Sequence, residues 1–321
     1  MPFSSSEPIF NKATLDFSSL NKDLNSEDPI IAKSIKFLSL HSIFAPKSKT
    51  TLIPFLLGHK PDKAGLSIFS IIFKFNLAIT KKNSVKNIHL SSKRDWHVQD
   101  FTAYITTKKI SPLRNNLSPD IVPNLFDPAK CMKAGNRFIA ENNLYEDKFS
   151  LLILGGNGIG YKYDKNEWDE ILKNFSDFCM RSNTKQVFIT SPRTPIEVEN
   201  IIQSRYDTSI SVLFHSENKR GSFSHLFYIA TNIFVTEDSS TMLSEAISSG
   251  KRIVCVYPER INAPKKYTEI IQKYEALNFI KRRNIKEICD TPFNEAIDIS
   301  SAVNQSLAEF NKLLVELLSD Q

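Results

Sequence analysis

Long apolar runs and paired cysteines are both missing from this sequence of 321 residues. Its longest apolar stretch, residues 66–80, contains Lys74 and is shorter than the ~20 residues that a helix needs to cross a bilayer. The four cysteines lie far apart, with no CxxC pair and no histidine at ligand spacing. These absences exclude a membrane-spanning role for that stretch and argue against a zinc site or a disulfide framework.

A secretory signal and a strong charge bias are missing as well. The opening stretch, MPFSSSEPIFNK, does not have the basic-then-apolar order of a signal peptide. Lysine and arginine number 41 against 35 acidic residues, and this net charge of +6 suits an anionic ligand but is too small to indicate nucleic acid. We therefore expect a cytoplasmic protein, and peripheral contact with the inner face of a membrane stays an open alternative.

What the sequence does contain is a regular alternation of strand and helix patterns. Strands are predicted at residues 51–57, 87–91, 101–106, 149–154, 186–190, 210–214, 233–236 and 252–257. Helices are predicted at residues 29–44, 66–78, 129–142, 165–180, 196–204, 222–230, 241–249, 265–277 and 301–318. Such alternation is typical of an α/β fold with parallel sheets.

Residues 111–128 divide this pattern into two halves. The segment carries four prolines among asparagine and aspartate residues and is predicted to be a linker without regular structure. We therefore expect two facing Rossmann-like domains, residues 1–128 and 129–300. A C-terminal helix within residues 301–321 is expected to pack back on the first domain.

The sequence holds only nine glycines, and four of them fall within residues 155–160. The stretch LLILGGNGIGYKYD, residues 151–164, runs from a predicted strand into this turn. A dinucleotide fingerprint needs G-x-G-x-x-G, but Tyr161 stands at the third position and no acidic partner follows the next strand. The pattern therefore argues against NAD. Two interpretations stay open, an anion cradle or a crowded turn without a ligand.

The stretch ITSPRTP, residues 189–195, follows the next predicted strand. Ser191, Arg193 and Thr194 offer hydrogen-bond donors there, and arginine is well suited to bidentate phosphate contacts. The alternative is that Thr194 caps the following helix and Arg193 is simply solvated.

The stretch VTEDSSTMLSEAISSGKRIVCV, residues 235–256, is the densest in polar residues at a predicted helix start. Asp238, Ser239 and Ser240 are good capping residues whose hydroxyls and free amides suit a diphosphate. Glu245, one to two turns into the helix, is placed to hold ribose hydroxyls. The alternative is a well-capped helix with a solvated Glu245. Gly250 is expected to form a left-handed cap after this helix.

These stretches, in this order, resemble the family of the plant mitochondrial-fission (elongated-mitochondria) protein. Bacterial members of that family are regarded as glycosyltransferases, including ones assigned to lipooligosaccharide outer core. Its middle motif reads roughly S-R-R-T-P, and its last motif reads V-T-x-D-S-x-x-M-x-x-E-A-x-x-x-G-K-P-V. The matching residues are Ser191, Arg193, Thr194, Pro195, Thr236, Asp238, Ser239, Met242, Glu245, Ala246, Gly250 and Lys251.

The resemblance covers about residues 120–277 and has clear departures. Pro192 stands where the family commonly has arginine, and Arg252 stands where it commonly has proline. The family's opening segment, of the type Asp-Gly-Lys-x-Gly-His-x-x-Gln, has no counterpart at the start of this chain. The stretch GHKPD, residues 58–62, is only superficially similar to it.

The resemblance implies a glycosyltransferase of the two-domain GT-B type that acts in bacterial surface-glycan synthesis, such as lipooligosaccharide or capsule. It implies a nucleotide-sugar on the second domain, a saccharide or lipid-linked acceptor on the first, no further cofactor and no metal. The residues expected to bind the nucleotide-sugar are Gly155, Gly156, Asn157, Ser191, Arg193, Thr194, Asp238, Ser239, Ser240, Met242 and Glu245. The expected catalytic residues are Arg193, for charge on the leaving diphosphate, and His59 as general base, chosen over Asp62, Asp95 and His97.

Two other functions stay open on the same fold. One is a non-catalytic scaffold or binding protein, and the other is a nucleotide-sugar epimerase of the non-hydrolysing two-domain type. The basic cluster Lys281-Arg282-Arg283 is expected to be a solvated run. Its alternative role is to bind an anionic lipid or a phosphorylated saccharide.

Overall fold

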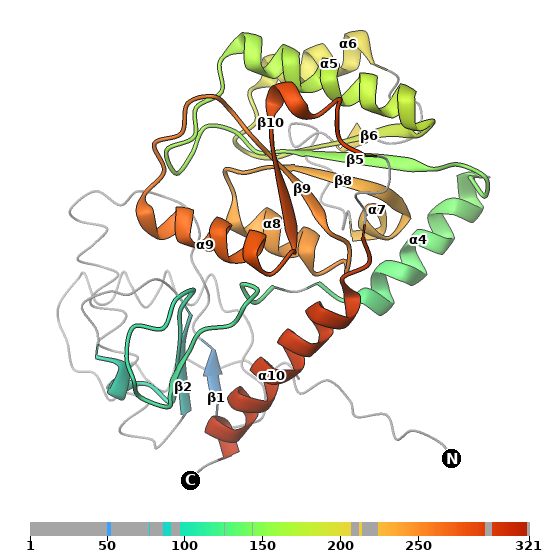
Figure 1. Ribbon diagram of the computed structural model, residues 1–321. Helices are drawn as coiled ribbons and strands as arrows, with labels where there is room; N and C mark the ends of the chain where they lie inside the picture. The colour runs from blue at the N-terminus through green and yellow to red at the C-terminus, as the bar shows by residue number, and fades with distance from the viewer. Residues whose placement is uncertain are drawn as a thin grey trace, which may run out of the picture. The chain divides into compact units, whose positions relative to one another are not determined.

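The computed structural model describes residues 50–52, 77, 86–90, 97–124, 126–142, 144–206, 212–213, 224–292 and 297–319 (Figure 1). The chain divides into two compact units. The first combines Met1–Ser118 with Phe310–Gln321, and the second is Pro119–Glu309. His59, the predicted helix at residues 29–44 and all but Leu77 of the helix predicted at residues 66–78 lie outside the described residues.

The first unit contains a parallel sheet in the order β1-β2-β3-β4. Its strands are β1 (Thr50–Leu52), β2 (Lys86–Leu90), β3 (Ala103–Ile105) and β4 (Asn116–Leu117), and a 3-10 turn spans Val98–Asp100. The prediction that residues 111–128 have no regular structure is wrong at β4. The amide side chain of Asn116 explains this, because its Oδ1 accepts hydrogen bonds from the Ile110 and Ser111 amides and its Nδ2 donates to the Tyr104 carbonyl.

Helix α10 (Ser300–Ser319) belongs to both units by its packing. Near its start, Val303 and Leu307 pack on the core of the second unit. Near its end, apolar side chains at helical spacing pack on the core of the first sheet, namely Phe310, Leu314, Leu317 and Leu318 on Ile88, Ala103, Ile105 and Leu117. Of the helices that the structure describes, none is long and apolar enough to cross a bilayer.

The second unit contains a six-stranded sheet in the order β10-β9-β8-β5-β6-β7, with every pair parallel. The strands are β5 (Phe149–Leu154), β6 (Lys185–Thr190), β7 (Val212–Leu213), β8 (Ala230–Thr236), β9 (Ile253–Tyr257) and β10 (Ile280–Asn284). The helices are α4 (Pro128–Asn142), α5 (Lys165–Ser182), α6 (Ile196–Arg205), α7 (Ser224–Ile229), α8 (Ser240–Ile247) and α9 (Lys265–Ala276), and Ile285–Glu287 forms a 3-10 turn. The predicted α/β class with parallel sheets is confirmed.

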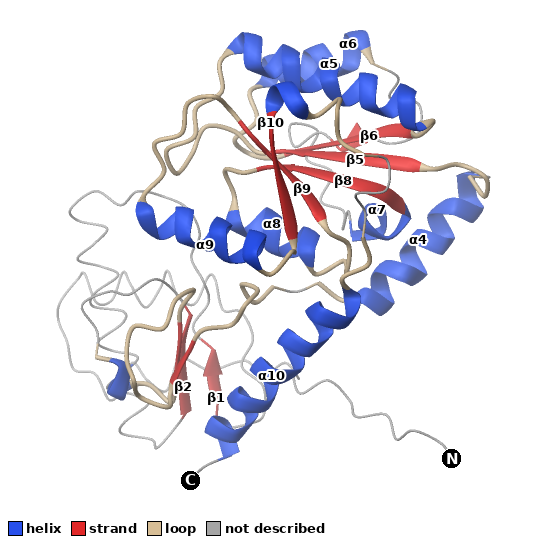
Figure 2. Ribbon diagram, viewed as in Figure 1, coloured by secondary structure: helices blue, strands red, loops and turns tan. Residues whose placement is uncertain are grey.

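Helices cover both faces of this second sheet. Figure 2 shows α5 and α6 over one face and α8 and α9 over the other. Every residue of β5 is buried, which is why its sequence, FSLLIL, is nearly all apolar rather than alternating. Phe175 and Phe178 of α5 meet Phe234 of β8 edge to face, and such pairs add about 0.5–1.5 kcal/mol each beyond the area that they bury.

The ends of two helices follow the sequence closely. Asp164 caps α5 through a capping box with Glu167, so the first turn of α5 is closed by the chain's own carboxylates. Gly250 has φ +79°, which confirms the predicted left-handed position after α8. A side chain would be strained there, and its Cβ would lie 2.3 Å from the Ser300 Oγ.

Candidate functional site

The predicted residues in the loops after β5, β6 and β8 come together where the order of the second sheet reverses. From β5 the chain proceeds to β6 on one side, whereas β8 pairs with β5 on the other side. Because all these strands are parallel, the loops after β5, β6 and β8 share one edge. Crevices at such switch points are where open α/β sheets bind ligands.

Gly155 and Gly156 follow β5 and are both buried. The Gly155 amide donates to the Thr236 hydroxyl at 2.7 Å, and the Gly156 amide donates to Asp238 Oδ2 at 3.1 Å. A Cβ at Gly155 would lie 2.2 Å from Asp238 Oδ1, and one at Gly156 would lie 2.0 Å from the Arg193 carbonyl oxygen. Because they have no side chain, the two glycines allow three loops to meet. Their amides donate hydrogen bonds to groups of the protein itself.

Asp238 is the buried acceptor at the centre of this meeting point. Its Oδ2 lies 2.6 Å from Arg193 Nη2, and its side chain is fully buried. Burial raises the pKa of this carboxyl, while hydrogen bonds from Thr236 and Gly156 and the charge of Arg193 oppose the rise. The ion pair thus offsets part of the cost of placing a carboxylate here.

Arg193 is anchored at one end only. Its side chain is 40% exposed, and its Nε and Nη1 make no hydrogen bond to any described residue. An arginine held by one nitrogen keeps its remaining N–H donors in a fixed direction for an anion. Arg193 therefore presents open guanidinium donors beside the switch point.

Ser191 and Thr194 hold the loop after β6. The Thr194 hydroxyl lies 2.8 Å from the Leu154 carbonyl and 2.6 Å from the Gly155 carbonyl, and it accepts from the Ser191 amide. The alternative that Thr194 caps α6 is therefore wrong, because its hydroxyl is engaged with the end of β5 and α6 has no side-chain cap. The Ser191 hydroxyl accepts from the Arg193 amide at 3.2 Å.

Helix α8 begins beside these loops. Ser239 caps it by accepting from the Met242 amide, as predicted, and Ser240 is its first residue. Met242 packs on the core. Glu245 is half-buried and has no hydrogen-bond or charge partner among the described residues, and burial raises the pKa of its carboxyl. Helix α8 therefore has a capped N-terminus and, at Glu245, a carboxyl group without a partner among the described residues.

Asn157, like Arg193, is exposed. Its Oδ1 accepts from the Tyr163 amide at 2.8 Å, which closes the loop between β5 and α5. Its Nδ2 makes no hydrogen bond to a described residue.

Glu237 and Arg282 form a buried ion pair that the sequence motifs do not indicate. Glu237 is 1% exposed, and its two oxygens lie 2.6 Å from Arg282 Nε and 2.8 Å from Arg282 Nη2. The expectation that residues 281–283 form a solvated run is wrong for Arg282, whose side chain is 28% exposed. Burial opposes the charge of Arg282, but Glu237 raises the pKa above its ordinary value. The sequence signal for this pair is Glu237 itself, an acidic residue directly after the buried strand β8.

Tyr161 connects this pair to the glycine-rich loop. Its hydroxyl donates to Glu237 Oε1 at 2.6 Å. Burial, and then the hydrogen bond to Glu237, raises the pKa of Tyr161 above its ordinary value, so the hydroxyl remains a donor. The backbones of Gly158 and Tyr161 exchange two hydrogen bonds and enclose Ile159 and Gly160. The Gly160 carbonyl accepts from the Asn262 amide, which joins this turn to the loop after β9.

Ile159 is strained in this turn. Its φ is +49° and that of Gly160 is +86°, a pair of positive angles that the two-residue turns of β-hairpins share and that suits Asn-Gly. A left-handed conformation costs a β-branched residue roughly 1–2 kcal/mol. Ile159 is also 42% exposed, so little packing compensates for the strain.

We expect Ile159→Asn to stabilise the protein. Relief of the strained angle should raise the free energy of unfolding by about 1 kcal/mol, which corresponds to a Tm increase of roughly 2–4 °C. Differential scanning calorimetry measures this directly. Ile261→Asn is the matched control, because Ile261 is similarly exposed but is not among the residues with positive φ. An equal gain in both variants would mean that lost apolar exposure, not strain, is responsible.

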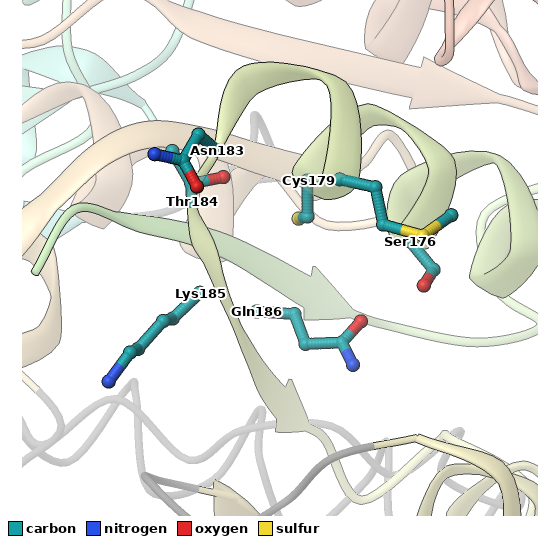
Figure 3. Close-up of a pocket in the computed structure, with 7 residues that line it drawn as sticks. Ser176, Cys179, Asn183, Thr184, Lys185 and Gln186 are labelled. Atoms are coloured by element: carbon teal, nitrogen blue, oxygen red, sulfur yellow. The ribbon is translucent and has the colours of Figure 1, made fainter.

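A hollow of about 230 Å³ lies elsewhere in the second unit (Figure 3). It is lined by Ser176, Cys179, Met180, Asn183, Thr184, Lys185 and Gln186. These residues come from the end of α5 and the start of β6, and β6 is parallel to its neighbours. The hollow therefore lies at the edge of the sheet opposite the candidate site.

Comparison with other sequences found one family and one curated relative. A sequence profile of the family described as Mitochondrial fission ELM1 matches residues 102–307. An uncharacterized protein of Rickettsia prowazekii (strain Madrid E) is 28% identical over 172 residues, which cover 50% of this chain and 47% of that protein. The chain thus spans about half the length of the curated relative.

Several solved structures have a similar arrangement at low sequence identity. The S. aureus MnaA–UDP structure is 12% identical, with a TM-score of 0.44 over 93% of this chain and 83% of that chain. The glycosyl transferase family 9 protein from Veillonella parvula DSM 2008 is 12% identical, with a TM-score of 0.38 over 80% and 81%. The C-terminal CMP-Kdo binding domain of WaaA from Acinetobacter baumannii is 13% identical, with a TM-score of 0.35 over 60% and 100%.

Proposed function

The chain belongs to the mitochondrial fission ELM1 family, as its motifs predicted, and from this membership and the switch-point site we propose that it is a glycosyltransferase. It takes a sugar from a nucleotide-sugar donor and transfers it to a saccharide or lipid-linked acceptor. The proposed setting is bacterial surface-glycan synthesis at the cytoplasmic face of a membrane, and the proposed fold is of the GT-B type.

The observation that supports this proposal best is Arg193 beside the start of α8. Arg193 is anchored on Asp238 with Nε and Nη1 open, and Ser239 and Ser240 begin α8 in the neighbouring loop. A helix N-terminus and an arginine together favour an anion, and they stabilise the charge that develops on a leaving diphosphate. In the proposal these groups serve in place of a metal ion. Gly155 and Gly156 make room for this arrangement rather than donating to the diphosphate.

Glu245 is proposed to bind the donor's ribose. Ser240 and Glu245 are separated by roughly 7.5 Å along the helix axis, and this separation suits a ligand that extends from a diphosphate to a ribose. A half-buried carboxyl without a partner gains by accepting hydroxyl hydrogen bonds. Asn157 and Met242 border the same segments and complete the proposed donor site.

The acceptor and the general base are assigned to the first unit. His59 remains the proposed base, and it lies outside the described residues. A base from this unit would deprotonate the acceptor hydroxyl while Arg193 stabilises the leaving group.

A binding experiment with Arg193→Met tests the donor site. Thermal shift and calorimetry with UDP, GDP, ADP and CMP should identify a nucleotide that stabilises the natural protein. Arg193→Met should weaken its binding about 10-fold or more, because a charge-assisted hydrogen bond is worth roughly 1.5–3 kcal/mol. Arg205→Met is the matched control, because Arg205 lies on α6 and pairs with Asp169 at the surface.

The outcomes separate the three candidate functions. Absence of stabilisation by every nucleotide would contradict the enzyme and favour the scaffold. Turnover of a nucleotide-sugar without an acceptor would indicate the epimerase. Turnover that requires an acceptor and is lost in Arg193→Met but kept in Arg205→Met supports the glycosyltransferase.

A further inference from the structure

We propose that Tyr161, Glu237 and Arg282 form a latch that holds the glycine-rich loop in its binding position. The latch residues are positioning residues, because Tyr161 and Arg282 act on the site only through Glu237 and the loop. The inference rests on the proposed donor site for its effect on binding, but the latch itself is a property of the apo protein.

Glu237 is the centre of the latch because it joins most of the elements around the switch point. Its side chain receives Arg282 from β10 and Tyr161 from the loop after β5, and the Cys255 thiol of β9 lies 3.5 Å from its Oε2. Its amide donates to the Val256 carbonyl, and its carbonyl accepts from the Tyr267 hydroxyl of α9. These contacts to its side chain, amide and carbonyl fix the position of Glu237.

The next residue, Asp238, faces the opposite side of the switch point. It receives Gly156 from the loop after β5 and Arg193 from the loop after β6. The two consecutive carboxylates therefore contact different parts of the glycine-rich loop. Asp238 binds the beginning of the glycine-rich loop, and Glu237 binds the part around Tyr161.

Tyr161 connects Glu237 to the glycine-rich loop. The Tyr161 hydroxyl donates a hydrogen bond to Glu237, and the Tyr161 backbone closes the turn that contains the strained Ile159. A strained turn persists only where its surroundings hold it. Removal of the Tyr161 hydroxyl should therefore release this turn while the Glu237–Arg282 pair remains intact.

Tyr161→Phe is the test, because it removes one oxygen and keeps the ring. Hydrogen exchange of the natural protein and the variant is measured without nucleotide. The probes are the Gly158, Tyr161 and Tyr163 amides, all of which are bonded within the loop. Exchange at these three amides should become about 10-fold to 100-fold faster, as expected for loss of a hydrogen bond to a charged group. Affinity for the nucleotide that stabilises the natural protein should fall about 5-fold or more.

Tyr274→Phe is the matched control. Tyr274 lies on α9, is as buried as Tyr161, and its hydroxyl bonds to the Ser244 hydroxyl away from the loop. Tyr274→Phe should lower Tm without changing exchange of the loop. A second variant, Glu237→Gln, keeps an oxygen for Tyr161 but weakens the pair with Arg282, and it should also speed exchange of the loop.

The latch is refuted if loop exchange in Tyr161→Phe and Glu237→Gln equals that of Tyr274→Phe. Faster exchange with unchanged nucleotide affinity would overturn its role in the site. Failure of every nucleotide to bind the natural protein would instead contradict the proposed function, and the exchange result would then still decide whether the latch exists.

Discussion

Arg282→Ala should lower the free energy of unfolding by about 3 kcal/mol, which corresponds to a Tm decrease of roughly 6–12 °C. The substitution leaves Glu237 with no charge partner at a position that is 1% exposed. A buried carboxylate that loses its arginine keeps its full desolvation cost, so the loss exceeds the net value of the pair. The ring of Tyr257 also loses the guanidinium that lies 4.4 Å from its centroid. Chemical denaturation at neutral pH measures the change.

Lys286→Ala is the control for Arg282→Ala. Lys286 pairs with Glu259, and the two side chains are 60% and 57% exposed. An exposed pair contributes about 0–1 kcal/mol, because water solvates both charges when the pair is broken. Similar losses in the two variants would show that the buried position of Glu237 does not determine the cost.

Gly156→Ala should cost about 3 kcal/mol and abolish nucleotide binding. Its Cβ would lie 2.0 Å from the Arg193 carbonyl oxygen and 2.8 Å from the Arg193 Cβ. A backbone carbonyl cannot swing aside as a side chain does, so the loop after β6 must move. Arg193 would move with it and lose its position on Asp238. Thermal denaturation and calorimetry with the stabilising nucleotide measure the two effects.

Gly158→Ala provides the same chemical change two positions further along the chain. Its nearest neighbour would be Arg193 Nε at 3.5 Å, which is ordinary van der Waals contact, and its φ is not positive. The variant should stay within about 0.5 kcal/mol of the natural protein. If Gly156→Ala were as mild as Gly158→Ala, the loops could not be packed as described.

Most of the second unit could be predicted from the sequence because its strands are buried runs separated by polar helix starts. The run FSLLIL of β5 is an example. Strand β10, with the sequence IKRRN, was missed because it lies at the edge of the sheet and three of its five residues are cationic. In the first unit, β4 was missed because it is two residues long and is stabilised by the Asn116 side chain rather than by an apolar pattern.

The candidate site was predictable only in part. Motifs place Arg193, Asp238 and Ser239 at strand ends, and the parallel sheet brings them together. The sequence does not show that Asp238 pairs with Arg193, or that Glu237 pairs with Arg282, because these partners are 45 residues apart and meet only through the strand order. It also suggested that Gly155 and Gly156 face a ligand, whereas the structure uses their amides for Thr236 and Asp238.

The two compact units differ in how their residues are ordered along the chain. The second is one continuous segment, Pro119–Glu309, whereas the first needs Met1–Ser118 together with Phe310–Gln321. In the order of the chain, the second unit has all of its residues once Glu309 is reached. The first still lacks Phe310 and Leu314, which pack on its sheet. The first unit therefore begins earlier in the chain than the second but is completed by residues that follow it, so loss of the residues after Glu309 would remove part of the first unit and no residue of the second.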